Sequence, residues 1–93
     1  MSEIKITSTT ENNYGWECRV KVIDEDKTKT EHLVTIPLPT YVRLTGKQYP
    51  VEKLVEKSFA FLLTKEPKES ILGQFTLDQI GEYFPDWENK MIK

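Results

Sequence analysis

Residues 16–22, with the sequence WECRVKV, alternate apolar and charged side chains. In an extended chain, Trp16, Cys18, Val20 and Val22 lie on one face, and the charged residues between them lie on the other. This period of two residues predicts a strand with one buried and one exposed face. It is the clearest strand pattern in the chain, and the prediction of the fold starts from it.

Two further strands are predicted on either side of this one. Ile4 and Ile6 alternate with polar residues, and residues 31–36 alternate again after the acidic reversal at residues 24–27. The inward face of the last strand holds His32, Val34 and Ile36, and the outward face holds Glu31, Leu33 and Thr35. With apolar faces on one side, Val20 lies opposite His32 or Val34. Short loops between the strands then predict an antiparallel three-stranded β-meander in residues 1–38.

The hydrophobic period changes to 3.6 residues after the segment Ile36-Pro37-Leu38-Pro39. Thr40 is expected to cap a short helical turn that Gly46 ends. Residues 50–64 predict the main amphipathic helix, with a stripe formed by Val51, Leu54, Val55, Ser58, Phe59, Leu62 and Leu63.

Two shorter C-terminal helices are expected after the main helix. One follows Pro67, and the other follows the capping-box pattern of Thr76 and Gln79 and ends at Pro85. We therefore predict a single α+β domain over residues 1–93, with a β-meander in 1–38, a helical half in 39–93, and the helices packed on one sheet face.

The composition narrows the class of protein. The 93 residues include 13 basic and 15 acidic side chains, and no basic block stands out, so nucleic acid is not expected as a partner. One cysteine allows neither an intrachain disulfide nor a zinc site. No apolar run reaches the length of a signal peptide or a membrane span. The expected location is the cytoplasm, without membrane association.

Several segments of the helical half carry a resemblance. They are LVEKSF at residues 54–59, FLL at 61–63, EPKESIL at 66–72, Phe75, and YFP at 83–85. With the Ile-Pro strand end before them, these segments make the chain similar to a group of short, functionally uncharacterised prokaryotic proteins. The resemblance covers roughly residues 30–88. It implies a complete, free-standing protein and implies no activity.

Candidate catalytic groups are few. Cys18 and His32 are the only thiol and imidazole, and no acidic residue on their face could orient the histidine as a base. The residues Asp24-Glu25-Asp26 lack the spacing of a calcium loop and are predicted to form a solvated hairpin tip. The glycines do not cluster, so a phosphate-binding loop is not expected. We predict no catalytic residue, metal or cofactor.

The C-terminal half contains six carboxylates that could perform acid–base chemistry if burial raised one pKa. They are Glu66, Glu69, Asp78, Glu82, Asp86 and Glu88. Glu66 and Glu69 lie in the first turn of an expected helix, where the helix dipole already favours negative charge. A carboxylate-based enzyme therefore ranks as the third hypothesis.

Aromatic residues near the C-terminus suggest a contact surface. Phe75 and Phe84 follow the buried helical spacing, whereas Tyr83 and Trp87 fit it less well. Together with Phe61 and Leu33, Tyr83 and Trp87 form the predicted partner-binding surface. The first hypothesis is a non-enzymatic protein–protein interaction module whose partner is another protein or a second copy of the chain.

The second hypothesis is a nucleic-acid-linked regulator of antitoxin type, because a strand and two helices occupy residues 31–64. In such a regulator, the strand face that enters the groove should carry basic or hydrogen-bonding groups. Here that face would present Glu31, Leu33 and Thr35, which favours a hairpin strand without a nucleic-acid role.

Overall fold

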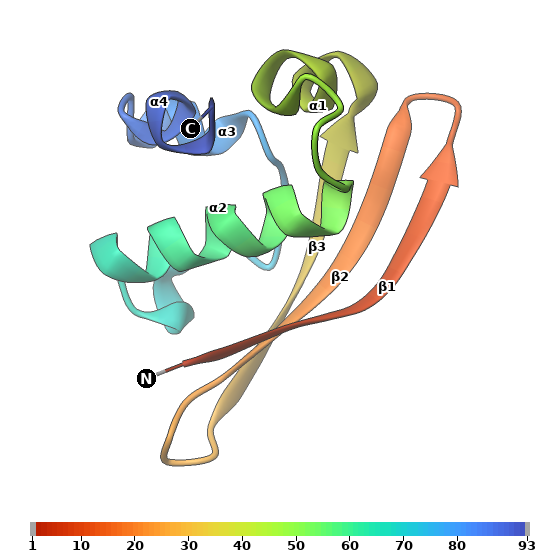
Figure 1. The fold of residues 1–93 in the computed structure, drawn as a ribbon. Coiled ribbons are helices and arrows are strands. Elements are labelled where there is room, and N and C mark those ends of the chain that lie inside the picture. The colour runs from red at the N-terminus through yellow and green to blue at the C-terminus, as the bar shows by residue number, and fades with distance from the viewer. Residues whose placement is uncertain (1, 93) are drawn as a thin grey trace.

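The computed structural model describes residues 2–92 and has an α+β fold. A twisted four-stranded sheet carries the helices on one of its faces (Figure 1). The strand order is β1-β2-β3-β4, with β1 at Glu3–Asn12, β2 at Gly15–Ile23, β3 at Lys29–Pro37 and β4 at Gln74–Thr76.

The first three strands pair antiparallel in chain order, as the sequence predicts, and Val20 lies opposite His32. At the β1–β2 turn, the side-chain oxygen of Asn12 accepts hydrogen bonds from the backbone N–H groups of Tyr14 and Gly15. Gly15 has a φ of +147°, and a Cβ at this position would lie 2.1 Å from the carbonyl oxygen of Ile36. Only glycine therefore allows β2 to start this close to the end of β3.

The fourth strand is absent from the prediction, so the three-stranded antiparallel sheet is wrong in this respect. β4 pairs parallel with β3, with Phe75 opposite Val34. The N–H of Leu33 bonds to the carbonyl of Gly73 at 2.8 Å, and the N–H of Leu77 bonds to that of Thr35 at 2.9 Å. A strand of three residues is too short to show an alternating pattern, and it lies within the segment predicted to be helical.

The helical elements are α1 at Leu38–Thr45, α2 at Val51–Lys65, the 3-10 turn η1 at Lys68–Ser70, α3 at Gln79–Tyr83, and α4 at Trp87–Ile92. The helix predicted after Pro67 is only this single 3-10 turn. Thr40 does not cap α1, because the helix starts directly after Pro37. Thr40 is buried inside α1 and donates a hydrogen bond to Asp78 at 2.6 Å.

The core lies between α2 and the sheet. Leu54, Val55 and Phe59 of α2 are fully buried in one cluster with apolar residues of β2 and β3. Ser58 is buried in the same helical stripe, and its hydroxyl accepts a hydrogen bond from the indole N–H of Trp87 at 3.1 Å. This bond connects α2 to α4. Among residues 2–92, no helix is long and apolar enough to span a membrane.

Candidate functional site: an apolar groove between α2 and α3

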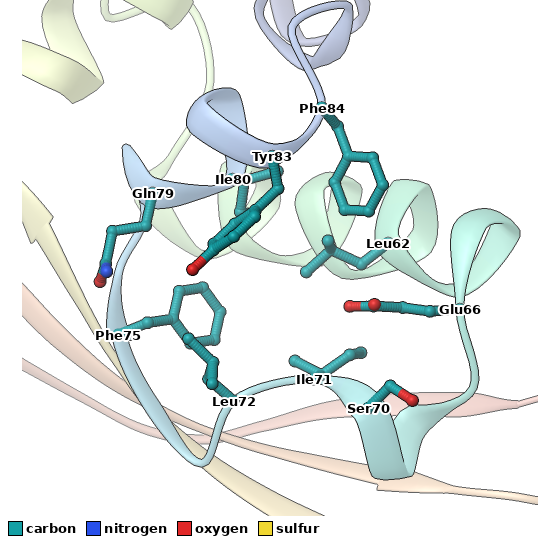
Figure 2. A pocket seen from close by; sticks show the side chains of 10 residues that line it. All are labelled: Leu62, Glu66, Ser70, Ile71, Leu72, Phe75, Gln79, Ile80, Tyr83 and Phe84. Atoms are coloured by element: carbon teal, nitrogen blue, oxygen red, sulfur yellow. The ribbon is translucent and has the colours of Figure 1, made fainter.

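An apolar groove of about 180 Å³ opens between the C-terminal end of α2, the segment from η1 to β4, and α3 (Figure 2). The side chains that line it are mostly aliphatic or aromatic. They are Leu62, Glu66, Ser70, Ile71, Leu72, Phe75, Gln79, Ile80, Tyr83 and Phe84. We refer to this site as the groove.

The rim of the groove carries two exposed apolar side chains. Tyr83, the last residue of α3, is 68% exposed, and Leu72, in the segment before β4, is 49% exposed. Ile71, Phe75 and Ile80 are buried and form the floor. Exposed apolar side chains that gather around a hollow can mark a contact surface, and tyrosine is enriched at the energetically important positions of such surfaces.

Hydrogen bonds from the core fix the wall that carries Leu72. His32 is buried, and its Nδ1 lies 2.7 Å from the carbonyl oxygen of Leu72 while its Nε2 lies 2.8 Å from the Thr30 hydroxyl. Since a carbonyl oxygen can only accept, Nδ1 carries the proton of this bond. On the opposite wall, the N–H of Thr76 donates to the side-chain oxygen of Gln79 at 2.8 Å, which is one half of the predicted capping box.

A buried lysine fixes η1 to the β2–β3 loop. The ammonium group of Lys68 lies 2.7 Å from a carboxylate oxygen of Asp24 and 2.8 Å from the hydroxyl of Thr28, and it also contacts Glu69. The hydrogen bond from Lys68, followed by one from Ser2, lowers the pKa of Asp24. The bonds to Asp24 and Glu69 raise the pKa of Lys68. The acidic reversal of the sequence therefore has a structural role in holding the groove wall.

Cys18 and His32 do not form a nucleophile–base pair. The two ring nitrogens of His32 are occupied, Nε2 by Thr30 and Nδ1 by the carbonyl oxygen of Leu72. The thiol of Cys18 lies 3.7 Å from the hydroxyl of Thr9. Cys18 is fully buried, and this burial raises the pKa of its thiol. A buried thiol with a raised pKa is a poor nucleophile.

The carboxylates of the C-terminal half do not converge on the groove. Four of them have basic partners: Glu69 contacts Lys68, Asp78 and Glu88 contact Arg43, and Asp86 contacts Lys65. Glu66 is the single acidic residue of the groove lining. A pair of facing acids is therefore absent from this hollow. Among residues 2–92, no group of three His, Cys, Asp or Glu residues is arranged to hold a metal ion.

A second hollow, beside α1, α3 and α4, is more open than the groove and is lined by charged side chains. Its Arg43 pairs with Asp78 and Glu88. Because Arg43, the one basic side chain of its lining, is already paired, this hollow offers an anionic ligand no free cation.

The structure does not bring the four predicted partner-binding residues together. Tyr83 lies on the rim of the groove. Phe61 is 8% exposed and packs edge-on against Phe84, and Trp87 is completely buried, so neither forms an open surface. Leu33 is half-buried and alternates with the buried residues His32 and Val34 of β3, so it lies on the opposite face of the sheet. Of the predicted contact surface, only Tyr83 is at the groove.

The sequence analysis assigned no contact role to the other residues of the groove lining, and Leu72 and Glu66 are the two that matter most here. Leu72 belongs to a short irregular segment, where no periodicity distinguishes exposed from buried apolar residues. Glu66 was placed in the first turn of the next helix, whereas it is the C-terminal cap residue of α2. The sequence signal for this position was Pro67, which disfavours helical geometry in the residue before it.

The fold and the groove define an α+β domain with an open apolar hollow and no facing pair of acids in it. Neither a family model nor a curated protein nor a solved structure matches the chain. The resemblance to short prokaryotic proteins therefore stays a prediction.

Proposed function

We propose that this chain is a non-enzymatic protein–protein interaction module whose groove receives one apolar side chain of a partner protein. The observation that carries the proposal is the pairing of an apolar hollow with the exposed Tyr83 and Leu72 on its rim. Burial of such an anchor and of the rim would remove apolar surface from water, which is the main driving force of association.

The size of the groove supports a side chain as its occupant. An apolar cavity of about 150 Å³ accommodates a benzene molecule, whereas pockets for small ligands usually measure about 300–1,000 Å³. The groove, at about 180 Å³, therefore fits one leucine or one aromatic ring and is small for a cofactor.

The candidate catalytic groups support a binding role over an enzymatic one. The groove contains one carboxylate, and the single thiol and imidazole are buried in contacts with other residues. We place the protein in the reducing cytoplasm as part of this proposal, and a free thiol such as that of Cys18 stays reduced there.

A random-peptide display selection tests the proposal. The wild-type chain and two variants, Tyr83→Ala and Tyr14→Ala, are used as targets. Tyr14 is a matched control, because it is 78% exposed at the β1–β2 turn and does not line the groove. Both substitutions remove an exposed tyrosine, so each is expected to change the stability by less than about 0.5 kcal/mol.

The expected result is that the wild type and Tyr14→Ala enrich peptides with a shared apolar anchor, and that Tyr83→Ala does not. Equal enrichment by both variants, or no enrichment by the wild type, would refute the proposed function. Light scattering on the same proteins shows whether the partner is a second copy, since Tyr83→Ala would then dissociate a dimer that Tyr14→Ala retains.

A further inference from the structure

We infer that the partner segment carries a lysine or arginine beside its apolar anchor, and that Glu66 pairs with this cation. The inference rests on the proposed function of the groove. It names the chemistry of the partner: a segment of another protein with adjacent basic and apolar side chains.

The first observation is the position of Glu66. Its side chain points into the space between Leu62 and Ile71, among apolar neighbours (Figure 2). The residue is half-buried, and within residues 2–92 its carboxylate has no hydrogen-bond or ion-pair partner. An acid in an apolar lining is unusual, because apolar surroundings disfavour its charged form.

The second observation is the position of Glu66 relative to α2. Glu66 caps the C-terminal end of this helix, where its N–H bonds to the carbonyl of Leu62 at 2.9 Å. The C-terminal end of a helix carries a partial negative charge and favours cations. A cation at this place would interact with the carboxylate and with the free carbonyl groups of the last turn.

The basic side chains nearest in sequence have other partners. Lys65 lies 3.6 Å from Asp86 and stands over the ring of Phe61 at 5.3 Å from its centre. Lys68 is buried in its contacts with Asp24 and Glu69. The cation that would complement Glu66 therefore has to come from the partner.

Removal of water from Glu66 on binding makes a basic group in the partner necessary. An apolar anchor that covers the groove removes water from the carboxylate of Glu66, and an unpaired charge is costly to bury. A segment that also brings an ammonium or guanidinium group compensates this cost. The groove thus discriminates against purely apolar segments.

The test is a peptide selection on the wild type and on Glu66→Gln, a variant of the same shape without the charge. Tyr83→Ala is included as the groove variant. We expect the wild type to enrich peptides with a Lys or Arg beside the apolar anchor, and Glu66→Gln to retain the anchor while losing the basic preference. For a selected synthetic peptide, replacing the basic residue by norleucine should weaken binding about tenfold with the wild type and less than about twofold with Glu66→Gln.

The outcomes separate the inference from the function on which it rests. If Glu66→Gln and the wild type enrich the same basic residues, or if the wild type enriches anchors without them, the inference is wrong and the proposed function stands. If no peptide depends on Tyr83, the proposed function itself fails. A dimer that Tyr83→Ala dissociates would also overturn the inference, because a second copy would then occupy the groove.

Discussion

The position of Glu66 at the C-terminal end of α2 leads to a prediction about stability. A helix end carries about half an elementary charge. For a carboxylate about 5 Å from that charge, with an effective dielectric constant of about 40, the unfavourable interaction is about 0.8 kcal/mol. Replacing Glu66 by glutamine should therefore stabilise the free protein by about this amount and raise its Tm by about 3–6 °C.

Glu52 provides the matched control with the opposite sign. It lies in the first turn of the same helix and is also half-buried. A carboxylate in the first turn is favoured by the positive end of the helix dipole, so Glu52→Gln should destabilise the protein by a similar amount. The two variants thus make the same chemical change, glutamate to glutamine, at opposite ends of one helix.

Urea unfolding followed by circular dichroism measures both effects. Near 1 M salt, where the Debye length is about 3 Å, the two shifts should shrink together. If Glu66→Gln destabilises the protein, or if both variants shift in the same direction, then Glu66 is not electrostatically unfavourable in the free protein. Glu66 would then have no unfavourable charge for a cation of the partner to relieve.

Three further predictions concern buried groups. Ser58→Ala should destabilise the protein by about 1–3 kcal/mol in urea unfolding, because the buried indole N–H of Trp87 loses its acceptor. The hydrogen bond from Lys68 lowers the pKa of Asp24. Ionised Asp24 therefore stabilises the fold at pH values above the ordinary carboxyl pKa, and this contribution is lost as the pH falls through the lowered pKa. For Lys68→Met we therefore expect an unfolding free energy that falls less steeply than that of the wild type between about pH 5 and pH 3; an equal slope would contradict this. Cys18 should react with a thiol reagent only at the rate of unfolding, because the thiol is buried and its pKa is raised; rapid labelling of the native protein would contradict its burial.

The parts of the fold that were predictable are those with a long periodic signal. The alternation in residues 16–22 and in residues 31–36 gave the correct faces, since a slip of one residue would expose the apolar face. It left either His32 or Val34 opposite Val20, and the structure pairs Val20 with His32. The 3.6-residue stripe likewise gave α2 within one residue of its bounds. Ser58 was placed in the buried stripe only because of its helical spacing. Its hydrogen bond with the indole N–H of Trp87 explains why a polar side chain is tolerated there.

The groove was not predictable, because short elements form most of it. η1 and β4 have three residues each, and tertiary bonds from His32 and Lys68 hold this segment in place. Neither bond follows from local propensity, since the partners lie far apart in the sequence. The sequence shows six carboxylates in the C-terminal half but does not show which of them form ion pairs. Only the structure therefore distinguishes Glu66 from the paired carboxylates.

Tyr83 and Trp87 were both predicted to lie on the contact surface, but Tyr83 is exposed and Trp87 is buried. The two residues are four positions apart, so on one continuous helix they would share a face. Pro85 lies between them, α3 ends at Tyr83, and a separate helix, α4, begins at Trp87. The break allows Trp87 to turn into the core and bond Ser58, while Tyr83 stays 68% exposed at the groove. An aromatic pair that straddles a helix-ending proline should therefore be assigned to surface or core one residue at a time, and of this pair only Tyr83 is exposed to a partner.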